Sequence, residues 1–93
     1  MDDDALTYEQ EVAVCRRWII LNAGHTRRIQ RRESSYSYKH RVESECGDYI
    51  SNEAFIEAAR SLGYHTVPCG PASPNRYFNM SLPKWKQEGY NND

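Results

Sequence analysis

The first part of the chain has an amphipathic helical pattern. Apolar side chains recur every three or four residues along one stripe, which comprises Tyr8, Val12, Val14, Cys15, Trp18, Ile19 and Leu21. Thr7 and Gln10 have the spacing of a capping box, in which each side chain accepts a hydrogen bond from the amide of the other residue. Gly24 is suited to end the helix in the left-handed conformation. The pattern predicts a helix over about residues 7–23.

Two shorter helices are predicted in the middle of the chain. Ser34 or Ser35 can cap a helix over about 35–46, which Gly47 ends and whose apolar positions are Tyr38, Val42 and Cys46. Ser51 can cap a helix over about 52–62, which Gly63 ends and whose apolar positions are Phe55, Ala58, Ala59 and Leu62. Only four residues, 47–50, separate the two helices, so a tight helix-to-helix turn is expected.

The apolar pattern changes to alternation after Gly63. Residues 64–67 can form a short strand, and residues 76–82 alternate, with Phe78, Met80 and Leu82 on one side. Three prolines and a glycine between residues 68 and 75 predict a loop, so the two strands are expected to form a hairpin. Residues 25–34 hold one aliphatic side chain, Ile29, and are interpreted as a connector or a short edge strand.

These elements predict a fold that is mainly α with a small C-terminal β-hairpin. The 93 residues suit a single domain, which we expect over residues 1–83, followed by a tail over 84–93. Trp85 and Tyr90 are the candidates for holding that tail against the domain. The order of helix, helix, tight turn, helix and hairpin matches a winged helix-turn-helix domain, so a three-helix domain of that kind is the expected architecture.

Several classes of protein are disfavoured by composition. The chain has no run of about 20 apolar residues that could span a membrane, and its acidic start lacks the basic end of a signal peptide. Its three cysteines, at positions 15, 46 and 69, are widely spaced and expected to be reduced, which suggests a cytoplasmic protein. No close cysteine pair accompanies His40 or His65, and no nucleophile signature or phosphate-binding glycine loop is present. We therefore expect no metal, no cofactor and no enzymatic activity.

The net charge of −1 conceals separate blocks of charge. Residues 25–41 hold six Arg or Lys side chains against one Glu, between blocks over 1–11 and 42–60 that each hold five acidic side chains. Such fields steer association with a partner more than they determine a fold. Four of the arginines fall within residues 27–32, where they can bind phosphates or carboxylates through paired hydrogen bonds. The alternative is a solvated loop that balances the acidic segments of the same chain.

Aromatic and acidic residues beside this block extend the candidate contacts. Tyr36, Tyr38 and His40 can stack on bases or form a hot spot for a protein, although the spacing of Tyr38 favours the core. The acidic side chains after residue 42 can imitate a phosphate backbone, or can simply form a solvated helix surface. Glu53 and Glu57 would disfavour the approach of their helix to DNA. The predicted partner contacts are Arg27, Arg28, Arg31, Arg32, Tyr36, Lys39, His40 and Arg41, with Glu53 and Glu57 as a second, acidic surface.

Residues 31–43 (RRESSYSYKHRVE), residues 49–59 (YISNEAFIEAA) and Gly63-Tyr64 together resemble a pattern of small proteins from phages and other bacterial mobile elements. The resemblance implies an inhibitor of host defence, of which anti-CRISPR proteins are one class. It implies a non-enzymatic interaction protein that acts in a bacterial host. We expect this protein in the host cytoplasm, as a monomer or homodimer. Its expected partner is a host protein or nucleoprotein complex that handles nucleic acid, with the nucleic-acid backbone as a further contact. The alternative is a small winged-helix transcription regulator that places the basic block on DNA phosphates.

Overall fold

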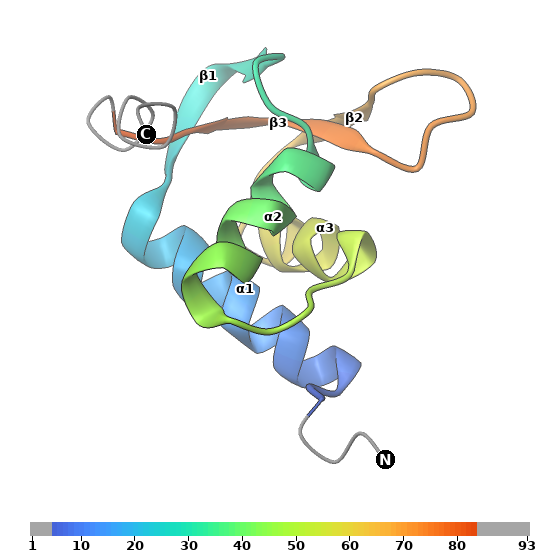
Figure 1. Ribbon diagram of the computed structural model, residues 1–93. Coiled ribbons are helices and arrows are strands. Elements are labelled where there is room, and N and C mark those ends of the chain that lie inside the picture. The colour runs from blue at the N-terminus through green and yellow to red at the C-terminus, as the bar shows by residue number, and fades with distance from the viewer. Residues whose placement is uncertain (1–4, 84–93) are drawn as a thin grey trace.

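Three helices and three strands make up the fold, and the strands come together in one sheet. The computed structural model describes residues 5–83, so the predicted tail with Trp85 and Tyr90 lies outside the described residues. The elements are α1 (Tyr8–Asn22), β1 (Gly24–Gln30), α2 (Ser35–Cys46), α3 (Asn52–Ser61), β2 (Thr66–Pro68) and β3 (Arg76–Ser81). The strands form an antiparallel sheet in the order β1-β3-β2, and the three helices pack beneath it in the view of Figure 1.

The predicted helices and most of their caps are confirmed. Thr7 and Gln10 form the reciprocal capping box of α1, and the Ser34 and Ser51 hydroxyls accept from the third residue of α2 and α3. Gly47 ends α2 with φ +81°. The prediction that Gly24 ends α1 in the left-handed conformation is wrong. Ala23 leaves the helix in an extended conformation with φ −120°, because the chain passes directly from α1 into β1.

The sheet is larger than predicted and is not confined to the C-terminal part of the chain. The expected hairpin is present as β2 and β3, but β1, which lies between α1 and α2, pairs with the other side of β3. The mixed architecture of three helices and three strands therefore replaces the mainly α fold with a C-terminal hairpin. Of the two interpretations of residues 25–34, the edge strand is confirmed. Its exposed, basic sequence had hidden the third strand, because an edge strand is held by backbone hydrogen bonds and needs little apolar alternation.

A wide bulge interrupts β1 opposite one buried asparagine. His25 pairs with Met80 and Gln30 with Phe78, so residues 26–29 lie opposite the single residue Asn79. The Asn79 side chain is 7% exposed and bridges both edges of the sheet. Its Nδ2 donates to the Thr26 carbonyl oxygen (3.2 Å), and its Oδ1 accepts from the His65 amide (2.7 Å). This amide therefore fixes where the bulge leaves the sheet.

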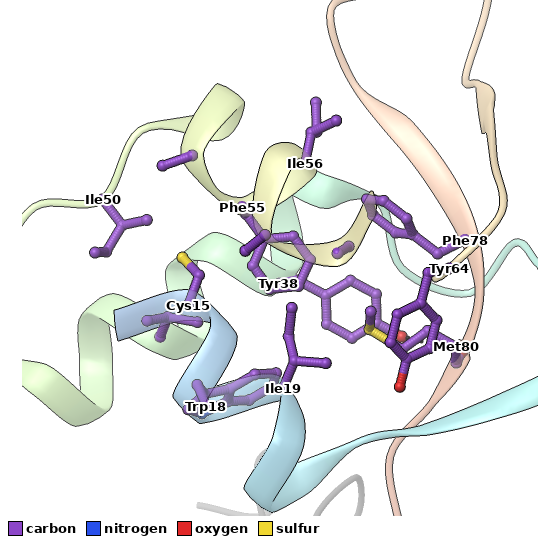
Figure 2. Close-up of a cluster of buried hydrophobic side chains, with 14 of the residues drawn as sticks. Cys15, Trp18, Ile19, Tyr38, Ile50, Phe55, Ile56, Tyr64, Phe78 and Met80 are labelled. Atoms are coloured by element: carbon purple, nitrogen blue, oxygen red, sulfur yellow. Dashed lines mark hydrogen bonds between the residues drawn. The ribbon is translucent and has the colours of Figure 1, made fainter. Parts of the chain in front are cut away.

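Aromatic rings from the helices and the sheet fill the core, which Figure 2 shows. The Phe55 ring stacks on Tyr38 with centroids 5.4 Å apart and meets Phe78 edge-on at 5.6 Å. Phe78, Met80 and Leu82 all face inward, as the alternation predicted. Three predicted members of apolar stripes are exposed instead, namely Tyr8, Leu21 and Cys46. Each lies in the terminal turn of its helix, where neighbouring elements no longer cover the stripe.

Candidate interaction surfaces

The bulge in β1 presents two arginines to solvent. Arg27 and Arg28 are both exposed, and the backbone beneath them is held in place. The Arg28 carbonyl oxygen accepts from the Thr26 hydroxyl (2.7 Å) and from Gln30 Nε2 (3.1 Å), in addition to the Asn79 contact at Thr26. The two guanidinium groups are consequently carried by a structured backbone at the edge of the sheet.

Arg31 and Arg32 follow in the connection from β1 to α2 and are also exposed. The Arg31 guanidinium carbon lies 5.4 Å from the centroid of the Tyr77 ring, which belongs to the neighbouring strand β3. The ion pairs within residues 5–83 include none with Arg27, Arg28 or Arg31. We refer to the exposed guanidinium groups of Arg27, Arg28, Arg31 and Arg32 as the arginine surface; its segment forms the top edge of the molecule in Figure 1.

Arg41, one of the predicted partner contacts, is buried in the structure. Its side chain is 5% exposed and forms a two-pronged ion pair with Glu33, with Nε to Oε1 at 2.8 Å and Nη2 to Oε2 at 2.6 Å. The Ser37 hydroxyl donates a further hydrogen bond to Glu33 at 2.9 Å. Arg41 therefore links α2 to the segment that precedes the helix, and it leaves little surface for a partner.

Lys39, another predicted partner contact, is also buried and paired. Its side chain is 8% exposed, and its Nζ lies 3.0 Å from Glu43 Oε2. Glu43 also bonds His40 Nδ1 at 2.9 Å and accepts from the Ile50 amide at 3.0 Å. Burial alone would raise the pKa of the Glu43 carboxyl, but the Ile50 amide and the Lys39 and His40 side chains outweigh burial and lower this pKa. Glu43 thereby joins α2 to the turn before α3.

Two tyrosine rings cover the buried ammonium of Lys39 and remain largely exposed themselves. Lys39 Nζ lies 5.4 Å from the centroid of Tyr36 and 4.8 Å from the centroid of Tyr49. Tyr36 is 51% exposed and Tyr49 is 68% exposed. The His40 ring meets Tyr36 edge-on at 4.4 Å, and its side chain is 43% exposed. We call Tyr36, His40 and Tyr49 the aromatic platform; Tyr49 was absent from the sequence-based set.

The predicted acidic surface borders an open hollow on α3. Glu53 and Glu57 are exposed, and the Tyr8 hydroxyl donates to Glu57 Oε1 at 2.7 Å. This hydrogen bond, together with partial burial and the nearby carboxylates, raises the pKa of Tyr8 to about 12. The hollow has a volume of about 600 Å³ and is lined by Tyr8, Glu53, Ile56, Glu57, Arg60, Ser61 and Arg76. Its two arginines make the surface mixed in charge and not purely acidic.

A smaller apolar depression of about 200 Å³ lies between α1 and α2. Val14, Trp18, Leu21 and Val42 supply its apolar lining, and Arg17 and Glu45 are among its polar residues.

None of the described helices has the length and apolar character to cross a membrane. Among residues 5–83, no three His, Cys, Asp or Glu side chains gather as ligands for a metal ion.

Comparisons with protein-family models, curated proteins and solved structures find no match to this chain. Of the predicted contacts, the structure keeps Arg27, Arg28, Arg31, Arg32, Tyr36 and His40 at the surface around β1 and α2, and Glu53 and Glu57 at the surface of α3. It removes Lys39 and Arg41 from that surface and adds Tyr49.

Proposed function

We propose that this chain is a non-enzymatic interaction protein of phage or mobile-element origin that binds a host complex through the arginine surface. The observation that carries the proposal is the division of the cations within the basic block. Lys39 and Arg41 are buried and neutralised by Glu43 and Glu33, whereas Arg27, Arg28 and Arg31 have no carboxylate partner within the described residues. Exposed guanidinium groups on a fixed backbone suit an anionic partner.

The proposed mode of action is occupation of the partner's surface, as in anti-CRISPR inhibitors. The bulge supports this mode because Asn79 and Gln30 hold its backbone from below and leave the Arg27 and Arg28 side chains free to reach outward. A partner rich in phosphate or carboxylate groups would gain several charge-assisted hydrogen bonds here without reordering the chain. A host complex that handles nucleic acid offers such groups.

Capture from a bacterial host lysate tests this proposal. The tagged protein is compared with the double variant R27E/R28E and with the control R17E/R60E, which makes the same charge change at exposed residues of α1 and α3. We expect R27E/R28E to lose the captured complex and the control to retain it, with unchanged helix content by circular dichroism. Retention of the complex by R27E/R28E would refute the assignment of the arginine surface.

A winged-helix transcription regulator is the second candidate, and one observation favours it. The element order α1-β1-α2-α3-β2-β3 and the sheet order β1-β3-β2 match the arrangement of winged-helix domains, with the β2–β3 connection as the wing. In that arrangement α3 would enter the DNA major groove. Its exposed Glu53 and Glu57 oppose this approach electrostatically, which is why the regulator ranks second.

The two candidates predict opposite results for α3. A regulator should shift duplex DNA in a gel with a steep dependence on salt, and R60E should weaken that shift. The interaction protein should capture its complex equally well whether Arg60 is kept or replaced by glutamate. Loss of capture in the R17E/R60E control would therefore direct attention to α3.

A further inference from the structure

We propose that the aromatic platform binds unpaired bases, so that the anionic partner of the arginine surface is a single-stranded nucleic acid. This inference rests on the proposed function and specifies the chemical class of the partner. It depends on three features of the described residues: the rings are exposed, neighbouring side chains contact them, and arginines lie close to them in the chain.

The rings of Tyr36 and Tyr49 are largely exposed, which a stacking base requires. Lys39 Nζ lies over the rings of both Tyr36 and Tyr49, within 5.4 Å and 4.8 Å of their centroids. Despite this contact with the ammonium, Tyr36 is 51% exposed and Tyr49 is 68% exposed. Every base has a π-face, so such rings bind bases with little dependence on sequence.

A network of charged side chains, in which only Lys39 is buried, contacts the rings. Lys39 is fixed by Glu43, and Glu43 also bonds His40 and the Ile50 amide at the end of the turn into α3. His40 in turn meets the Tyr36 ring edge-on. A platform that is already ordered loses little conformational entropy when a base stacks on it.

Arginines adjoin the platform along the chain. Arg31 and Arg32 lie in the connection before α2, separated from the helix by Glu33 and Ser34, and Tyr36 lies in the first turn of that helix. Proteins that bind single strands typically combine arginine side chains, which contact the phosphate backbone, with exposed aromatic rings, which stack on the bases. Tyrosine and arginine also occur at protein interfaces, but a protein partner does not require ring faces and phosphate-binding guanidinium groups side by side.

Two oligonucleotides separate the contribution of bases from that of phosphates. An unstructured oligothymidine of about ten nucleotides and an abasic strand of the same length carry the same phosphates. In fluorescence anisotropy, we expect the wild-type protein to bind the oligothymidine at least about fivefold more tightly than the abasic strand. A difference of this size is typical of one stacked base. The logarithm of its affinity should fall with the logarithm of salt concentration with a slope of about −3, for four phosphate contacts on a single strand.

The variants assign this difference to the platform. Y36A and Y49A should each weaken binding of oligothymidine at least about fivefold and leave binding of the abasic strand unchanged. Y36F and Y49F keep the rings and should restore binding, which excludes a merely structural effect. Y8A, which removes a tyrosine of similar exposure beside α3, is the matched control and should bind as the wild type does. R27E/R28E should weaken binding of both strands.

The outcomes distinguish failure of this inference from failure of the proposed function. Equal affinity for the two strands would overturn the stacking inference and indicate that phosphates alone are bound. No binding of either strand, by a protein that still captures its host complex through Arg27 and Arg28, would also overturn the stacking inference and would indicate a protein carboxylate as the anionic group. Capture that survives R27E/R28E would instead overturn the proposed function.

Discussion

Replacement of Glu33 by glutamine tests whether the buried Arg41 is neutralised by Glu33 within the fold. The substitution keeps the shape of the side chain but removes the charge that faces Arg41, whose side chain is 5% exposed, and it weakens both hydrogen bonds of the pair. Loss of one partner of a buried ion pair costs about 3–5 kcal/mol. Because glutamine can still accept one hydrogen bond, we expect the lower end, about 3 kcal/mol, out of a total stability of about 5–15 kcal/mol for a domain of this size.

The free energy of unfolding can be measured by urea titration, with the fluorescence of the buried Trp18 as the signal. A loss of about 3 kcal/mol corresponds to a fall in Tm of about 12–24 °C. The control E53Q removes a carboxylate that is exposed on α3, and it should change stability by less than about 0.5 kcal/mol.

A double-mutant cycle then isolates the pair. If Glu33 and Arg41 stabilise one another, E33Q and R41M together should cost at least about 1 kcal/mol less than the sum of the single variants. Equal effects of E33Q and E53Q, or strict additivity in the cycle, would refute the view that Arg41 is held internally by Glu33.

Three further predictions follow from other contacts. The pKa of Glu43 is lower in the folded protein than its ordinary value of 4.5. The ionised carboxylate therefore stabilises the fold above pH 4.5, and this contribution is lost as the pH falls through the lower pKa of the folded state. E43Q should flatten the acid limb of a stability–pH profile, and an unchanged profile would contradict the network around Glu43. N79A should lower the free energy of unfolding by about 1–3 kcal/mol, because the Thr26 carbonyl and the His65 amide lose their hydrogen-bond partner. It should also speed hydrogen exchange at residues 26–29, and unaltered exchange would show that Asn79 does not hold the bulge. Burial raises the pKa of the Cys15 thiol to about 12, whereas Cys46 is exposed. Iodoacetamide should therefore modify Cys46 in the native protein and Cys15 only after unfolding, which mass spectrometry can determine. Rapid modification of Cys15 in the native protein would contradict its burial.

Local patterns were sufficient to predict the helices. Capping residues such as Thr7 and Ser51 and the left-handed Gly47 act over a few residues, and their spacing alone located the ends of α2 and the starts of α1 and α3. The strand β1 was harder to recognise, because it is an exposed edge strand held by pairing with a segment some fifty residues away. Asn79 looked like one polar outward position among several, and only the register of the sheet places it opposite the bulge.

The candidate site was predicted in part for a similar reason. The density of arginines over residues 27–32 is visible in the sequence, but which cations are neutralised is decided by tertiary contacts. The four-residue spacing of Lys39 and Glu43 is a local signal that could have identified that pair. The pairing of Arg41 with Glu33 spans eight residues and the edge of a helix, and the approach of Tyr49 to Lys39 depends on the turn between α2 and α3. Neither contact has a periodic signature.

The most direct test of the account is to locate the partner on the protein surface by NMR. Isotope-labelled protein is titrated with the unstructured oligothymidine, and the changes in amide chemical shift are mapped onto the chain. We predict that the largest changes fall in residues 26–32 and at the platform residues Tyr36, His40 and Tyr49. Changes centred on the hollow of α3, around Glu57 and Arg60, with residues 26–32 unaffected, would contradict the central role of the arginine surface.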